Sequence, residues 1–192
     1  MELIHFLKEK MLVTKAMEEY IHANSELITI PKGQILMKPK TKNNKFSTSV
    51  LFIEKGIARV YSNKKDKVFT MRFLAENNFS FSIERNLLNK NDDYSWETIE
   101  ECQIRIFDFN TFEKALNQFN ELERLTRQLL MITLFEYQEL CYNSRVLSAK
   151  EKFDKLMQEQ PDLFLRVPLG HIATYLGITP QVLSVMRSKK ST

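Results

Sequence analysis

Hydroxyl and basic side chains gather near the C-terminus, where residues 163–192 contain four Lys or Arg and one His but no carboxylate. Such groups suit the phosphates of a nucleic acid, because cations and hydroxyl donors pair with phosphate oxygens and no nearby acid repels the backbone. The segment therefore indicates a DNA contact. The residues assigned to phosphates are Thr179, Ser184, Arg187, Lys189 and Lys190.

Two short helices must position these groups, and residues 168–187 have the pattern for them. Gly177 can adopt the positive φ that ends a first helix, and Thr179 followed by Pro180 is an N-cap and first-turn pair that begins a second. This predicts a helix-turn-helix, whose second helix enters the DNA major groove. The alternative is an ordinary helical corner in a core. The apolar faces expected to pack together contain Ile172, Ala173 and Leu176 on one helix and Leu183 and Met186 on the other.

Composition and charge set the broad class of the protein. The 192 residues are 43% hydrophobic, which is enough to bury the core of one or two domains. The formal charge is +4, and all of the excess lies in residues 143–192, which carry eight basic and four acidic residues. No apolar run is long enough to span a bilayer and the first residues do not form a signal peptide, so a cytoplasmic protein without membrane contact is expected.

Residue types that would indicate an enzyme, a metal or a cofactor are sparse. Cys102 and Cys141 are not in CxxC spacing and the three His residues are scattered, so no disulfide, zinc site, iron–sulfur cluster or other cofactor is predicted. Both cysteines are expected to be packed. There is no nucleophile elbow and no phosphate-binding glycine loop, so we expect no enzymatic activity.

The periodicity of the sequence changes twice. Residues 1–24 have the apolar stripe of a helix, residues 26–109 break into short β-rich runs separated by turns, and helical periodicity returns after residue 110. Regular short strands predict an antiparallel sandwich or barrel. A short helix is expected over 111–119 and a long one over 121–143. The expected strands cover 27–30, 34–37, 50–54, 57–61, 68–74, 96–99 and 103–109.

The long helix has two apolar stripes and therefore two surfaces to bury. We expect one stripe to pack on the β-domain and the other on the same helix of a second subunit, in a two-fold dimer. A helix buried entirely within one subunit is the alternative. The stripe assigned to the dimer contains Leu122, Leu125, Leu129 and Ile132, and the other contains Leu130, Leu134, Tyr137 and Cys141.

The C-terminal part is predicted to form a separate winged module. Residues 144–149 are predicted to form a hinge, Ser148 is expected to cap a helix that continues to about Gln160, and Pro161 ends that helix. A short strand over 163–167 would make the module a winged helix-turn-helix. The expected domains are a β-roll over 1–119, a dimerisation helix and hinge over 120–147, and a DNA-binding domain over 148–192.

Over essentially its full length the chain resembles the cyclic-AMP receptor protein and fumarate–nitrate regulator (Crp/Fnr) family of bacterial transcription regulators. The resemblance depends on residues 30–33 opening the roll, residues 50–61 as a central hairpin, and residues 172–184 in the helix-turn-helix. It implies an α+β fold, with an antiparallel β-roll of the cyclic-nucleotide-binding type followed by a winged helix-turn-helix. It also implies a homodimer that binds a near-palindromic promoter site and contacts RNA polymerase.

The family's cyclic-nucleotide residues are replaced in this chain. The Gly-Glu pair that holds the ribose in nucleotide-binding members corresponds to Phe81 and Ser82, and the Arg-Ser pair that holds the phosphate corresponds to Tyr94 and Ser95. Without the phosphate Arg, a buried phosphate loses its charge-assisted partner, at a cost of several kcal/mol. The resemblance therefore predicts a degenerate effector pocket and no binding of cyclic AMP or cyclic GMP in the usual mode.

Two alternatives remain for this pocket. Substitute cations are available at Arg72, Arg85 and Lys90, although Lys and Arg in such loops are usually solvated. The aromatic side chains either line a pocket for a different effector or fill the space as core. They are Phe79, Phe81, Tyr94 and Trp96.

In the family, the first residues of the second helix and one residue a turn later face base edges, positions that here hold Pro180, Gln181 and Val185. Gln pairs with adenine and apolar side chains contact the thymine methyl, so an A·T-leaning site is expected. The leading interpretation is a DNA-binding regulator that works without cyclic nucleotide. The alternatives are the same architecture gated by another small effector, and an interaction module with weak or no DNA binding.

Overall fold

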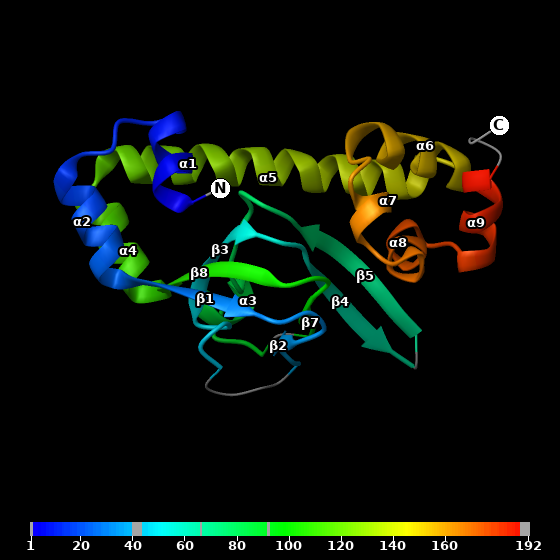
Figure 1. Ribbon diagram of the computed structural model, residues 1–192, viewed down its shortest axis with the longest axis horizontal. Helices are drawn as coiled ribbons and strands as arrows, with labels where there is room; N and C mark the ends of the chain where they lie inside the picture. The colour runs from blue at the N-terminus through cyan, green and yellow to red at the C-terminus, as the bar shows by residue number, and fades with distance from the viewer. Residues whose placement is uncertain (1, 40–43, 66, 92, 189–192) are drawn as a thin grey trace.

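The computed structural model describes residues 2–39, 44–65, 67–91 and 93–188; Lys189 and Lys190 lie outside these ranges. A β-roll lies below a long helix, α5, which runs across most of the molecule (Figure 1). The N-terminal helices lie near one end of α5, and the C-terminal helices α6–α9 lie at the other end, beside the roll. No helix within the described ranges is long and apolar enough to cross a membrane.

The N-terminal segment forms two helices rather than the single one predicted over 1–24. Helix α1 spans Leu3–Lys10 and α2 spans Lys15–Asn24. Met11 is extended, with φ −155°, and the side chain of Thr14 accepts a hydrogen bond from the Met17 amide at 3.2 Å. An extended residue followed by an N-cap restarts the helix in a new direction, which a continuous apolar stripe does not reveal.

Two four-stranded antiparallel sheets form the roll, as the spacing of short strands predicts. Their strand orders are β1-β8-β3-β6 and β2-β7-β4-β5. The first contains β1 (Ser25–Ile30), β8 (Cys102–Asp108), β3 (Ser49–Lys55) and β6 (Phe79–Ser80). The second contains β2 (Ile35–Met37), β7 (Ser95–Thr98), β4 (Ala58–Lys64) and β5 (Lys67–Leu74).

The predicted central hairpin over residues 50–61 is wrong, because β3 and β4 belong to different sheets. The chain passes between the sheets at Gly56, whose φ is +97°. A Cβ at this position would lie 2.5 Å from the carbonyl oxygen of Glu101, so the passage requires both a left-handed backbone and the absence of a side chain. The hairpin is instead β4–β5, in which Ala58 pairs with Leu74.

Helices α4 (Phe109–Gln118) and α5 (Asn120–Val146) follow the last strand and start within two residues of their predicted positions. Short helix α3 (Ile83–Asn86) and strand β6 had no counterpart in the prediction. The N-terminal half of α5 joins α1, α2 and one sheet in a common core. The buried residues of this core include Phe6, Leu7, Met17, Phe52, Leu122 and Leu125.

The structure reverses the roles expected for the two stripes of α5. Leu122 and Leu125, assigned to the dimer, are 6% and 7% exposed within the subunit, and Leu129 packs partly against the same core. Only Ile132 of that stripe is exposed. The other stripe, expected to cover the roll, is open to solvent: Leu130, Leu134, Tyr137 and Cys141. Both stripes are apolar, and the docking of the roll decides which of them is buried.

The C-terminal helices are α6 (Ala149–Glu159), α7 (Leu163–Arg166), α8 (Leu169–Leu176) and α9 (Pro180–Ser188). Ser148 caps α6 in a reciprocal capping box with Glu151, as predicted. The strand expected over 163–167 is wrong: this segment is helical, and the Val167 amide donates to the carbonyl of Leu163 at 2.8 Å. Pro161 and Asp162 accept from the amides of the next turn and nucleate it.

Candidate nucleic-acid interface and the cavity of the roll

Helices α8 and α9 meet at Gly177, which has φ +71° and ψ 29°. This left-handed residue ends α8, and the following Ile178 amide donates to the Ala173 carbonyl at 3.0 Å. Ala173 and Leu183 are fully buried where the helices pack, so α9 is anchored by its inner face. The side chain of Thr179 accepts from the Val182 amide at 3.3 Å, which is the predicted N-cap of α9.

The outer face of α9 is open to solvent. Every candidate DNA-contacting side chain that the structure describes lies on this exposed surface. Lys189 and Lys190 are outside the described residues. The exposed candidates are Thr179, Pro180, Gln181, Ser184, Val185 and Arg187. The fold thus brings hydroxyl, amide, apolar and basic groups together along one helix face.

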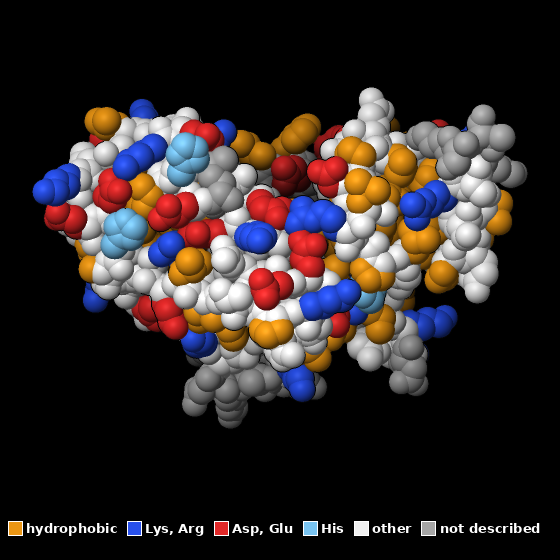
Figure 2. Space-filling model, viewed as in Figure 1, with side chains coloured by type: hydrophobic (Ala, Val, Ile, Leu, Met, Phe, Trp, Pro, Cys, Tyr) orange, Lys and Arg blue, Asp and Glu red, His pale blue; other side chains and the backbone are white. Residues whose placement is uncertain are grey.

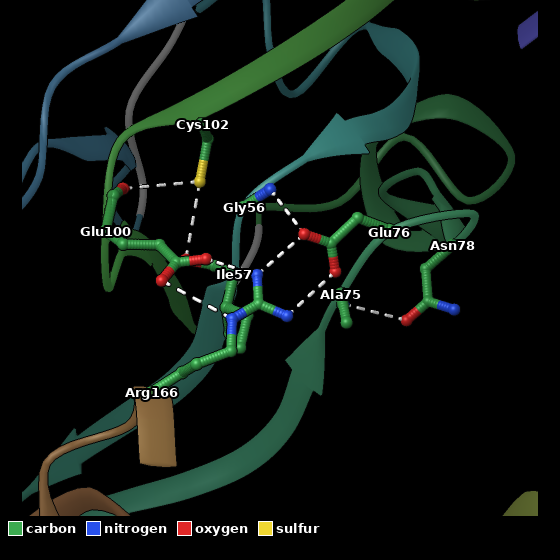
Figure 3. A network of polar contacts seen from close by, with 8 residues as sticks. All are labelled: Gly56, Ile57, Ala75, Glu76, Asn78, Glu100, Cys102 and Arg166. Atoms are coloured by element: carbon green, nitrogen blue, oxygen red, sulfur yellow. Dashed lines mark hydrogen bonds and ion pairs between the residues drawn. The ribbon is translucent and has the colours of Figure 1, made fainter. Parts of the chain in front are cut away.

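One basic residue of the acid-free segment has a different role. Arg166, at the end of α7, donates from Nη2 to Oε1 of Glu76 at 2.6 Å and from Nη1 to Oε2 of the same carboxylate at 3.1 Å. Its Nη2 also contacts Glu100. Figure 3 shows the guanidinium between the two carboxylates, both of which come from the roll. This charge therefore joins the C-terminal helices to the roll.

The ion-pair network also shifts the pKa values of Glu76 and Cys102. Burial raises the pKa of Glu76, but the hydrogen bonds from Arg166 and from backbone amides, including Gly56 at 2.8 Å, outweigh it and lower that pKa to about 2. Cys102 lies beside Glu100 in the same network (Figure 3). Burial and the charge of Glu100 raise the pKa of Cys102 to about 12, so this thiol stays protonated and unreactive. Cys141, expected to be packed, is exposed.

A second polar contact joins α8 to the roll. Arg59, on β4, places Nη1 2.8 Å from Nδ1 of His171, and its Nη2 donates to Glu97 at 2.6 Å. The hydroxyls of Thr70 and Thr174 lie 2.8 Å apart beside this pair. Burial and the charge of Arg59 lower the pKa of His171, against an opposing effect of Glu97. The Nδ1 that faces Arg59 is therefore an acceptor in the neutral ring.

These contacts surround an apolar core shared between the roll and the C-terminal helices. Ile57, Phe73 and Ile99 of the roll are buried against residues of α6–α9. On the face in Figure 2, acidic and basic side chains gather where the roll meets these helices. The buried C-terminal members are Phe153, Leu156, Leu163, Phe164, Val167, Ile172, Ala173, Leu176 and Leu183.

The roll and α5 line a half-open cavity of about 260 Å³. Of the predicted effector residues, Phe81 and Tyr94 line this cavity. Ser82 instead caps α3, where its hydroxyl accepts a hydrogen bond from the Arg85 amide at 3.0 Å. Ser95 is buried in β7. Of the candidate cations, Arg72 lines the cavity and Arg85 and Lys90 do not. The aromatic side chains thus line a cavity as well as contributing to the core.

No protein-family model matches the sequence, and no curated protein matches it. Solved structures do match. FixK2 from Bradyrhizobium japonicum aligns with a TM-score of 0.71 at 15% identity, covering 86% of this chain and 83% of its own. The c-di-GMP-responsive global regulator CLP from Xanthomonas campestris has a TM-score of 0.68 at 12% identity, covering 93% and 92%. A transcriptional regulator of the Crp/Fnr family from Eubacterium rectale has 0.67 at 16%, covering 91% and 82%.

The chain has a Crp/Fnr-like fold. At these identities the likeness shows the architecture alone, and it agrees with the resemblance found in the sequence. Two of the three neighbours are named as regulators of transcription or gene expression. Among the residues that the structure describes, no group of three or more His, Cys, Asp or Glu is arranged to hold a metal ion.

Sequence patterns did not reveal the residues that attach α7 and α8 to the Crp/Fnr-like roll. Arg166 lies in the acid-free segment that indicates a DNA contact but is not among the residues assigned to DNA, and no role is predicted for Arg59 or Glu97. One signal was available: Arg59 and Glu97 both fall in predicted strands with apolar neighbours, and a charge in such a strand needs a partner. Their pairing, at 2.6 Å, depends on β4 lying next to β7.

Proposed function

We propose that this protein is a homodimeric, sequence-specific DNA-binding transcription regulator that does not depend on cyclic AMP or cyclic GMP. The observation that carries the proposal is α9: Leu183 anchors it from within at 0% exposure, while Gln181, Ser184 and Val185 face outward. A rigidly held helix with an exposed polar face fits the major groove. The DNA would be a near-palindromic promoter site in the cytoplasm, and RNA polymerase would be a further partner.

The exposed groups on α9 suggest how a half-site is read. Gln181 offers an amide that pairs with N6 and N7 of adenine, and Pro180 and Val185 offer apolar contact to a thymine methyl. Thr179, Ser184 and Arg187 would contact phosphates and set the register of the helix. The half-site should therefore lean towards A·T pairs.

The exposed apolar face of α5 supports dimerisation. Met131, Leu134, Phe135 and Tyr142 are 59% to 67% exposed and lie on the part of α5 that the roll leaves uncovered. A second copy of the same helix would remove these side chains from water and is self-complementary under a two-fold axis. This pairing would present two α9 helices to successive major grooves, about one helical turn apart.

Independence from cyclic nucleotides is supported by Tyr94. Its hydroxyl donates to Oε2 of Glu84 at 2.9 Å, so a carboxylate stands beside the position where the family holds the phosphate with Arg. An anionic phosphate there would meet negative charge in place of a guanidinium. A second candidate function, gating by a different small effector, is favoured by the cavity of about 260 Å³.

Selection from a randomised duplex pool at two salt concentrations, with and without cyclic AMP, tests the proposal. We expect an inverted repeat with A·T-leaning half-sites, unaffected by nucleotide. Enrichment that requires cyclic AMP would contradict the independence from nucleotide, and retention of no DNA at low salt would favour the interaction module.

Single variants sharpen this test. Arg187→Ala should lower the slope of log affinity against log salt by about one, because one phosphate contact is lost. Gln181→Ala should relax discrimination at one base pair, by about 1–3 kcal/mol, with little change in the salt slope. Lys32→Ala removes an exposed charge from the roll and is the matched control, which should leave both quantities unchanged.

A further inference from the structure

The cavity between the roll and α5 is mostly apolar. Its volume of about 260 Å³ lies below the roughly 300–1,000 Å³ typical of sites for drug-sized ligands, so it suits a smaller molecule. Both sheets, α4 and α5 contribute to its wall. The apolar lining includes Phe79, Phe81, Trp96, Phe112, Leu125 and Leu129.

Arg72 supplies a cation to this apolar wall. Its Nη2 donates to the Ser80 hydroxyl at 2.8 Å and its Nη1 to the Tyr137 hydroxyl at 3.4 Å, while the guanidinium lies 5.8 Å from the Tyr137 ring centroid. Within the described part of the chain, Arg72 forms no ion pair with a carboxylate. A half-buried guanidinium held only by neutral groups retains its affinity for an anion.

Two buried donors at the same cavity also have no partner. The Nε of Arg72 and the Nε1 of Trp96 are buried, and neither donates a hydrogen bond to any group that the structure describes. Trp96 itself is 3% exposed. Buried N–H groups without an acceptor are costly, and both residues line the cavity, so a ligand oxygen that reached either N–H would remove this cost.

Glu84 is the carboxylate of the lining and limits the choice of ligand. Its Oε2 already accepts the Tyr94 hydroxyl at 2.9 Å, so part of its acceptor capacity is used within the protein. A ligand with a single negative charge suffices for Arg72, whereas a dianion would add repulsion from Glu84. This argues for one carboxylate rather than the dianion of a phosphate monoester.

We propose that the cavity binds a small monocarboxylic acid with an apolar body, its carboxylate on Arg72 and its body against the aromatic and leucine side chains. An anion that takes the Nη1 donor of Arg72 competes with Tyr137, which belongs to α5. Binding is thereby connected to the helix that carries the exposed apolar face. The acid's role as an effector of DNA binding rests on the proposed function, whereas its binding to the cavity does not.

The single tryptophan of the chain reports on this site directly, because Trp96 lines the cavity. Intrinsic fluorescence of the full chain would be titrated with octanoate and with 3-phenylpropanoate. Octanamide and octylamine serve as the neutral and cationic counterparts. We expect a saturable change with at least one acid, and binding of octanamide that is at least about tenfold weaker than that of octanoate.

Variants of Arg72 test whether the carboxylate of the ligand binds at this side chain. Arg72→Gln should weaken the binding of octanoate at least about tenfold. Arg72→Lys keeps the charge but not the planar fork, so its affinity for octanoate should lie between those of Arg72→Gln and the wild type. Lys67→Gln, an exposed residue of the same strand, should have no effect. Far-UV circular dichroism confirms folding of each variant.

Three results would overturn the proposal: no saturable response to either acid, equal or tighter binding of octanamide or octylamine, and equal losses in Arg72→Gln and Lys67→Gln. The comparison of ligands on the wild-type protein decides the matter even where a variant fails to fold. Because the readout needs no DNA, a negative result here is separate from failure of the DNA-binding proposal. Adding octanoate to the duplex selection then tests the regulatory step.

Discussion

Arg166 of α7 and Glu76 of the roll form a bidentate ion pair, with N–O distances of 2.6 and 3.1 Å. The two residues are 90 positions apart in the chain, and their side chains are 31% and 29% exposed. Glu100 contributes a second carboxylate from the neighbouring loop. The position of the C-terminal helices relative to the roll therefore depends on charges as well as on the apolar core that they share.

Replacing Arg166 with Ala should loosen this attachment. Two half-buried carboxylates lose their partner, at an expected cost of about 1–2 kcal/mol in the free energy of unfolding. Hydrogen exchange should increase first in α7 and α8, since local opening precedes global unfolding where contacts are fewest. Arg124→Ala, at an exposed position of α5, is the control. Equal hydrogen-exchange rates in Arg166→Ala and Arg124→Ala would show that the apolar core alone holds the C-terminal helices on the roll.

The contact between Arg59 and His171 predicts a dependence on pH. Burial and Arg59 lower the pKa of His171 in the folded protein, so the unfolded chain binds more protons as the pH falls below about 6.5. Stability is complete above that pH and decreases as the solution is acidified through the window between the two pKa values. Glu97, which faces the same pair, reduces the effect without reversing it.

Urea unfolding of the wild type at about pH 7.5 and pH 5.5 measures this decrease. His171→Gln should make the difference between the two conditions smaller. His22→Gln, at an exposed position on α2, should leave the difference unchanged. A pH dependence that survives intact in His171→Gln would assign it to other groups.

Gly56→Ala should destabilise the roll strongly. The new Cβ would lie 2.5 Å from the Glu101 carbonyl oxygen and 2.8 Å from the Cys102 sulfur, at a residue with φ +97°. We expect a loss of about 2–4 kcal/mol in the free energy of unfolding, measured by chemical denaturation. Gly33→Ala is the matched control: its φ is +77° but nothing lies within 4 Å, so it should lose only about 1 kcal/mol. Similar losses in both would show that backbone strain alone matters.

Phe135→Asp should convert the proposed dimer into a monomer. Phe135 is 62% exposed in the subunit, and a carboxylate at the centre of an apolar helix pair would be buried without a partner. Sedimentation velocity should show the mass halved, with no loss of secondary structure. Leu12→Asp changes a side chain that is 73% exposed elsewhere and should leave the dimer intact. A wild type that sediments as a monomer at micromolar concentration would contradict the proposed interface.

The sequence predicted those features that depend on neighbouring residues. Ser148 caps α6 and Thr179 caps α9, because a side-chain oxygen needs only the amides two or three positions ahead. Gly177 ends α8 for the same local reason, since a positive φ is a property of one residue. The antiparallel strands and the exposed face of α9 followed from periodicity.

Tertiary structure decided the features that depend on distant residues. The sequence around Gly56 predicts a hairpin, but β3 pairs with β8 and β4 belongs to the other sheet. The segment 163–167 has a strand-like composition but is held as a helix by turns begun at Pro161. Two apolar stripes on α5 became an inner and an outer face only when the roll covered Leu122 and Leu125.

The amino-acid sequence by itself thus determined most of the strands, the long helix, the caps of α6 and α9 and the chemical groups on α9, since these arise from interactions within a few residues. Only the tertiary structure decided that Arg166 serves the roll rather than DNA, that α5 leaves Met131, Leu134 and Phe135 uncovered, and that Arg72 meets an apolar cavity. Burial and charge pairing are properties of neighbours in space. Residues as far apart as Glu76 and Arg166 become neighbours only when the chain is folded.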